Sequence, residues 1–108
     1  MRRLTDLGRF SEPALLVLVS LLDGEKHGYA ISTDIAALTG RVLGPGTLYG
    51  AISRLEEAGL IESRSGDGRR KPYALTKTGL TVASAEVDRL TAIASEAHRR
   101  LRLRGAQA

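Results

Sequence analysis

Apolar residues recur every three or four positions through the first part of the chain, a pattern that predicts helices. A first helix is expected over Glu12–Leu22, with Ser11 as its N-cap, and it is apolar on nearly all sides. We therefore expect it at the centre of the core. A second helix is expected over Gly28–Leu38. Its apolar residues are expected to face the core, with Ser32, Thr33 and Asp34 outward. These apolar residues are Tyr29, Ile31, Ile35 and Leu38.

A third helix is expected to begin at Pro45, with Gly44 as N-cap, because proline is favoured at the first helical position. It runs to about Ala58, where Gly59 supplies a C-terminal stop. Its buried stripe is predicted at Leu48, Ile52 and Leu55.

After Gly59 the apolar period changes to two, which is typical of strands. Leu60–Arg64 and Lys71–Leu75 are the expected strands, and Pro72 favours an edge position for the second. The segment between them, Ser65–Gly68, is rich in turn formers and contains Asp-Gly, a hairpin signal.

Thr76 is expected to cap a last helix that continues to about Leu103. A helix of this length spans roughly 40 Å. The small domain formed by the preceding helices and strands, here called the head, can cover only part of it. The same helix of a second copy could cover the rest, and a helix folding back on its own head is the alternative. Apolar residues recur along it at spacings of three and four: Leu80, Ala83, Val87, Leu90, Ala94, Ala97 and Leu101.

The order of these elements predicts a mainly α fold of the α+β winged helix-turn-helix class. It has three helices, a two-stranded hairpin (the wing) and a long C-terminal dimerisation helix. We divide the chain into an N-terminal arm (1–11), a DNA-binding domain (12–76), the dimerisation helix (77–104) and a tail (105–108). The arm is either a short helix or partly disordered.

Composition removes several function classes. The chain of 108 residues has no cysteine, and its two histidines, His27 and His98, fall on different expected elements. We therefore expect no enzymatic activity, no metal site and no cofactor. The longest apolar run, Ala14–Leu22, is too short to cross a bilayer, so we expect a cytoplasmic protein without a membrane partner.

The formal net charge of +4 favours an anionic partner. In a winged helix-turn-helix the third helix enters the major groove and the wing reaches the phosphates, so we expect double-stranded DNA. Tyr49 is either a DNA contact or a core ring with its hydroxyl at the surface. The candidate DNA-binding residues are Gly46, Thr47, Tyr49, Gly50, Ser53 and Arg54 on the helix, and Arg64, Arg69, Arg70 and Lys71 on the wing. The basic groups at the two ends, Arg2, Arg3 and Arg9 and then Arg99, Arg100, Arg102 and Arg104, are interpreted as solvated.

Four motifs, in this order, resemble the PadR-like transcriptional regulators. They are His27–Ile31, Gly44–Tyr49, Arg54–Ile61 and Arg69–Gly79, and the similarity covers roughly Ala14 to Leu101. The resemblance is to the short class, with a single C-terminal helix.

The resemblance implies a homodimeric repressor that binds an inverted-repeat operator, and such repressors are often released by a small-molecule effector. It also implies that Thr47, Tyr49 and the wing residues contact DNA. Gly44 departs from the family, which often has a serine cap there. The chain has no tryptophan, so a flat aromatic drug site between subunits is not supported. A winged helix that binds another protein is the alternative function, although it would favour a neutral or acidic wing.

Overall fold

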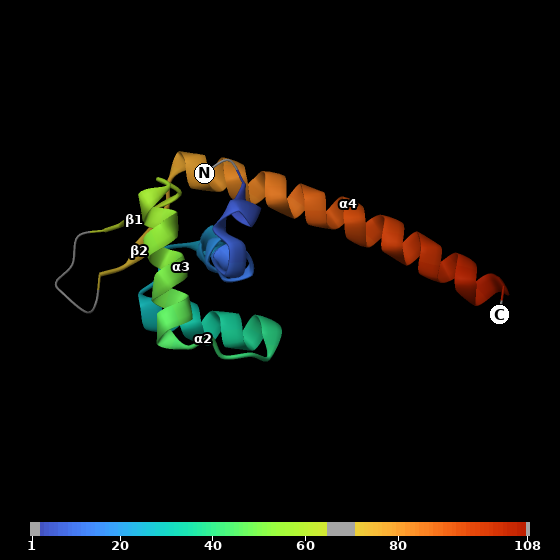
Figure 1. Cartoon of the computed structure of the whole chain (residues 1–108), viewed down its shortest axis with the longest axis horizontal. Coiled ribbons are helices and arrows are strands. Elements are labelled where there is room, and N and C mark those ends of the chain that lie inside the picture. The colour runs from blue at the N-terminus through green and yellow to red at the C-terminus, as the bar shows by residue number, and fades with distance from the viewer. Residues whose placement is uncertain (1–2, 65–70, 108) are drawn as a thin grey trace.

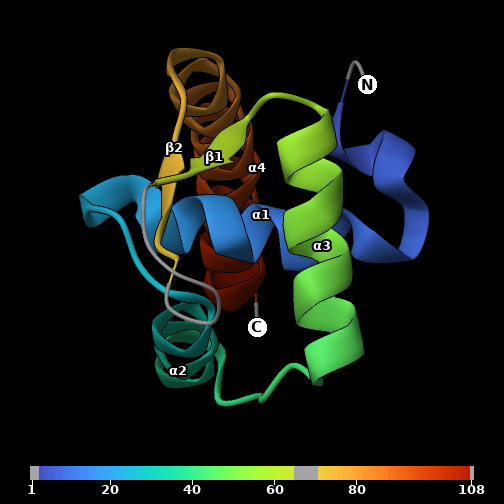
Figure 2. The ribbon, with the colours of Figure 1, turned by 90° about the vertical axis from the view of Figure 1, so that its left-hand side faces the viewer.

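The computed structural model describes residues 3–64 and 71–107 and places α1 (Ser11–Ser20) at the centre of the head. The helix packs against η1, α2, α3 and α4, and Ala14, Val17 and Leu18 have no exposed surface. A 3₁₀ turn, η2 (Leu21–Asp23), continues it. The expected central position is therefore confirmed (Figures 1 and 2).

The second helix, α2 (Gly28–Thr39), buries Ile31 and Ile35 but not the other two apolar residues assigned to that side. Tyr29 is 82% exposed and Leu38 is 57% exposed. Tyr29 lies two residues before Ile31, which is more than half a turn around the helix, and Leu38 lies in the last turn. The expectation that they join the core was wrong.

The third helix, α3 (Pro45–Glu57), begins where the Gly44-Pro45 pair predicted. Leu48, Ile52 and Leu55 are buried as expected. Gly59 has a φ of 74°, a left-handed conformation that favours glycine, and it ends this helical segment.

The strands β1 (Ile61–Ser63) and β2 (Tyr73–Leu75) form an antiparallel pair in which Glu62 lies opposite Ala74. Both are shorter than the sequence suggested. Lys26 and Tyr73 exchange two backbone hydrogen bonds, with N···O distances of 3.0 and 2.9 Å, which ties the pair to the turn before α2. These elements confirm the winged helix-turn-helix class.

The last helix, α4 (Lys77–Gln107), leaves the head and extends well beyond it (Figure 1). Thr76 Oγ1 accepts a hydrogen bond from the Gly79 N–H at 3.0 Å, so the predicted cap is confirmed. Ala83 is fully buried in the core of its own head, whereas the helix farther along is exposed. The alternative in which the helix folds back on its head was wrong. No helix in the described part of the chain is long and apolar enough to span a membrane.

The start of the chain forms η1 (Leu4–Phe10), two 3₁₀ turns separated by a kink at Gly8. Gly8 has a φ of 58°, which favours glycine, and the kink lets the segment change direction. Leu4 and Phe10 are both buried, and η1 packs against α1 and α3. The N-terminal residues from Leu4 onward therefore belong to the packed head.

Candidate nucleic-acid interface

The first turns of α3 present an open and uncharged surface. Gly46, Thr47 and Ser53 are exposed, and no charged residue lies between Pro45 and Ser53. Gly44 has no side chain, so it gives the first N–H groups of the helix no side-chain acceptor. Free N–H groups and the helix dipole at this end favour a phosphate or another anion.

Tyr49 lies between α3 and the start of α2. A Cβ built on Gly28 would lie only 2.3 Å from the Tyr49 hydroxyl oxygen, so the absence of a side chain at Gly28 makes room for the ring. Tyr49 is still 47% exposed. One side of its ring therefore packs against Gly28, and the rest is open to solvent. The sequence alone could not decide between a core ring and a surface residue.

Gly50 and Arg54 lie on the flank of α3 that faces the N-terminal segment. A Cβ on Gly50 would lie 2.6 Å from Cε1 of Phe10, and the Arg54 guanidinium lies over the same ring. Gly50 is one of the candidate DNA-binding residues, but the Phe10 ring occupies the space beside it. The missing side chain of Gly50 therefore makes room for this ring and does not open the helix to a DNA backbone.

The base of the wing is anchored by Tyr73, which is buried near the end of α3. Burial, and then the carboxylate of Glu56, raises the pKa of the Tyr73 phenol. The ring therefore stays neutral at physiological pH and acts as an apolar anchor.

The wing cations differ in their surroundings. Arg64 lies near two carboxylates, 3.3 Å from Glu62 and 3.8 Å from Glu25, whereas Lys71 is exposed. Arg69 and Arg70 lie outside the described residues. Exposed ion pairs are weak, so Arg64 remains able to exchange a carboxylate for a phosphate.

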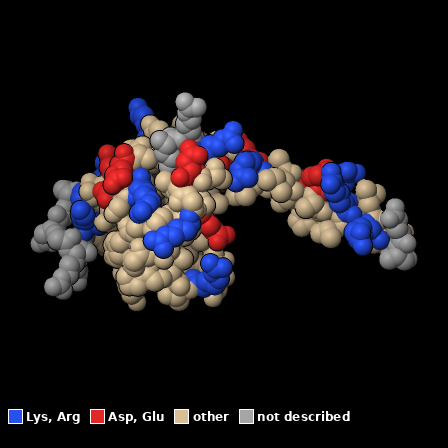
Figure 3. Space-filling view, viewed as in Figure 1, with Lys and Arg blue, Asp and Glu red and all other residues tan. Residues whose placement is uncertain are grey.

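Charged side chains are unevenly distributed over the head. Figure 3 shows basic side chains on the side of the strands, in the middle of the head beside α3 and near the free end of α4, while the part formed by α2 and the start of α3 is mostly uncharged in this view. At the free end, Arg99 and Arg100 share Glu96, and these hydrogen bonds lower the pKa of the Glu96 carboxyl. The basic group there is therefore partly neutralised within its own helix.

Beyond the head, α4 exposes an apolar stripe. The structure also exposes Ile93 and Leu103, which sequence reasoning did not include. Ile93 follows Leu90 by three residues, a spacing that could have identified it. Leu80 is also exposed, but it lies beside the head, before the buried Ala83. The exposed members of the expected stripe beyond the head are Val87, Leu90, Ala94, Ala97 and Leu101.

Comparison with known proteins connects this geometry to a family. Residues 17–85 match the family model described as the transcriptional regulator PadR-like family. The chain is also 42% identical over 78 residues to an uncharacterized 37.1 kDa protein in transposon TN4556 of Streptomyces fradiae. The match covers 72% of this chain but only 23% of that relative.

Two solved structures share the fold over most of their length. A transcriptional regulator from Clostridium thermocellum is 29% identical with a TM-score of 0.71, and the match covers 87% of this chain and 93% of that one. A PadR family transcription regulator from Clostridium difficile is 26% identical with a TM-score of 0.71, and the match covers 82% of this chain and 97% of that one. Both matches include the head and part of α4, because the head alone would cover less of the chain.

Proposed function

This chain belongs to the PadR-like family of transcriptional regulators, and we propose that it binds an inverted-repeat DNA operator as a homodimer and represses transcription. The observation that carries the proposal is the surface of α3, whose uncharged first turns are open and flanked by cations. Such a surface suits a helix that reads base edges while its neighbours bind phosphates.

In this proposal the DNA-binding domain, residues 12–76, assigns different roles to α3 and to the wing. The hydroxyls of Thr47, Tyr49 and Ser53 contact bases or nearby phosphates, and Gly46 allows the helix to approach closely. Arg69, Arg70 and Lys71 bind phosphates, so they supply affinity and salt dependence.

The dimer forms through α4, residues 77–104, whose exposed stripe packs against the same stripe of a second copy. A twofold axis through this pair presents two α3 helices in opposite orientations, which requires an inverted repeat. Ala83 is buried in its own head, so the proposed contact begins beyond it. Release by a small-molecule effector is implied by the family resemblance, and we assign no residues to such a site.

Selection from a random-sequence duplex library with the purified full chain tests the proposal. We expect recovered duplexes to share two inverted half-sites whose centres are about 10 base pairs apart or a multiple of that. A single unpaired half-site would contradict the homodimer. Failure to retain any duplex at low salt would contradict DNA binding and favour the protein-interaction alternative.

The wing and α3 should respond differently to mutation. Replacing Arg69, Arg70 and Lys71 together by alanine should weaken binding to all duplexes and reduce the slope of log K against log salt by about 2 to 3. Thr47→Val should instead change the selected sequence. The matched control removes Arg100, Arg102 and Arg104, which takes the same charge from the free end of α4. Equal losses in the two triple variants would reject the wing assignment.

Gly28 should control the position of Tyr49. Gly28→Ala places a methyl group against the Tyr49 hydroxyl, so the ring must move and we expect weaker binding to the selected duplex. The same substitution in a Tyr49→Ala background should have little further effect, giving a coupling on the order of 1 kcal/mol. Fluorescence anisotropy with the four variants measures this coupling, and additive effects would show that Gly28 acts independently of Tyr49.

A further inference from the structure

Two guanidinium groups share one aromatic ring beside α3. Phe10 is only 7% exposed, and Cζ of Arg54 lies 3.8 Å from the ring centroid. Cζ of Arg9 lies 4.7 Å from the same centroid. Arg54 Nη1 also donates to the Gly50 carbonyl at 3.0 Å, so its side chain is held at two points.

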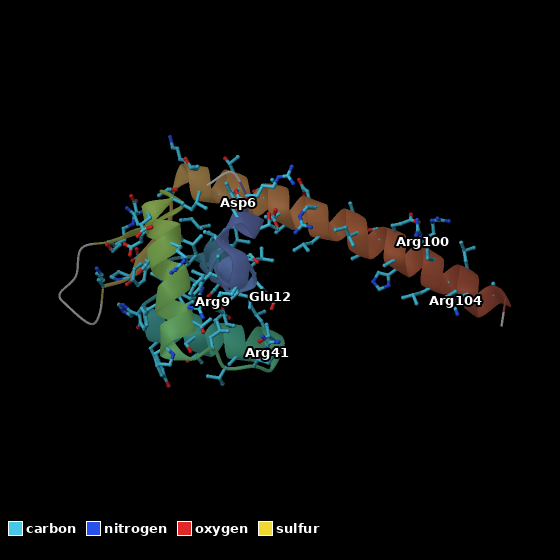
Figure 4. All side chains as sticks on the ribbon, in the orientation of Figure 1. Asp6, Arg9, Glu12, Arg41, Arg100 and Arg104 are labelled. Carbon is cyan, nitrogen blue, oxygen red and sulfur yellow. The ribbon has the colours of Figure 1, made fainter. Side chains whose placement is uncertain are left out.

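These two cations keep their charge. Within residues 3–64 and 71–107, no carboxylate lies within ion-pair distance of Arg9 or Arg54, whereas Arg64 and Arg89 have such partners. Stacking on a ring orients a guanidinium but does not neutralise it. In Figure 4 Arg9 lies along α3, while Asp6 lies near α4. The flank of α3 therefore carries two oriented, uncompensated positive charges.

The location of the pair gives it a specific role. Figure 2 shows α3 between the two strands on one side and the N-terminal segment on the other. A helix with its side chains is about 10–12 Å wide, and the major groove is about 12 Å wide with a phosphate backbone along each edge. A helix seated in that groove therefore meets phosphates on both flanks, and the wing serves only one of them.

We propose that Arg9 and Arg54, oriented by Phe10, form a phosphate-binding pair that contacts the DNA backbone on the side of α3 opposite the wing. This inference rests on the proposed DNA binding and extends it to the N-terminal segment. Arg9 is then a DNA contact, not a solvated arm residue. Phe10 is a positioning residue, because it acts through the two guanidinium groups.

The test compares Arg9→Gln with Arg3→Gln in the full chain, using the duplex recovered by selection. Arg3 is in the same segment but lines a hollow against α4 with Val82 and Ala85, so it is a matched control for charge. Arg9→Gln should weaken binding about five- to tenfold near 0.1 M salt and reduce the salt slope by about 0.9. Arg3→Gln should leave both unchanged.

Phe10→Leu tests the positioning role while keeping the site apolar. In that background Arg9→Gln should lose most of its effect, and thermal unfolding of each variant checks that the head is folded. Ethylation interference gives a separate readout: Arg9→Gln should remove the phosphate contacts on one flank of each half-site and leave those of the wing.

Three outcomes overturn the inference. Arg9→Gln and Arg3→Gln could have equal effects on affinity and salt slope. Arg9→Gln could weaken binding with an unchanged salt slope. Ethylation of the same phosphates could still interfere with the binding of the Arg9→Gln variant. In each case wild-type binding would leave the proposed function intact. A wild-type chain that binds no duplex would instead reject the proposed function, and the phosphate pair with it.

Discussion

Gly79→Ala is expected to destabilise the protein by about 3 kcal/mol, because the new methyl group would overlap a backbone atom. A Cβ at this position would lie 1.8 Å from the Leu60 carbonyl oxygen. That carbonyl accepts the Thr76 N–H at 3.1 Å, so it cannot move away without breaking a hydrogen bond. The substitution therefore forces the start of α4 away from the end of α3.

Gly105→Ala is the matched control in the same helix. A Cβ at Gly105 meets nothing within 4 Å, so the alanine should stabilise the helix by up to about half a kcal/mol through its better helix propensity. Chemical denaturation of the two variants measures the difference. Equal stabilities would show that the contact between Gly79 and Leu60 does not limit the packing of α4.

The same contact connects the two functional parts of the chain. Thr76 Oγ1 donates to the Gly59 carbonyl at 2.6 Å and accepts from the Gly79 N–H, so one side chain joins the end of α3 to the start of α4. In the proposed dimer, α4 sets the position of the second head. This junction therefore helps to fix the distance and angle between the two reading helices.

Local signals explain why much of this could be predicted from the sequence. Gly44-Pro45 marks the start of α3, and Leu48, Ile52 and Leu55 occupy its buried face. These signals act within one or two helical turns and depend little on the rest of the fold. The antiparallel pairing of the two strands was also predictable, although the paired strands, Ile61–Ser63 and Tyr73–Leu75, are shorter than expected, and the predicted turn at Ser65–Gly68 lies outside the described residues.

The contacts that could not be predicted join residues far apart in the sequence. Phe10 meets Gly50 and Arg54 only because Gly8 redirects the chain, and a single kink leaves no periodic pattern. The pairing of Arg64 with Glu25 is likewise set by a distant contact, because the hydrogen bonds between Tyr73 of β2 and Lys26 hold the strand pair against the turn before α2. The sequence was therefore sufficient to locate α3 but not the segment that packs on its flank.

The strongest test of the proposed dimer is a charge placed in the apolar stripe of α4. Ala94 is exposed in the single chain, so Ala94→Glu should leave the head folded. In a dimer whose α4 stripes pack together, the substitution buries one carboxylate from each copy in the apolar contact, which is costly without a cationic partner. We expect the variant to be monomeric by sedimentation velocity.

Ala92→Glu adds the same charge two residues away, about 160° around the helix from Ala94. Ala92 is also exposed, and its variant should remain dimeric. Because two linked heads bind an operator far more tightly than one, Ala94→Glu should lower affinity for the selected duplex by about 100-fold or more, and Ala92→Glu should not. A dimeric Ala94→Glu variant with full affinity would place the interface elsewhere. Loss of the dimer without loss of affinity would show instead that a single head is sufficient, so these outcomes separate the assembly from the reading of DNA.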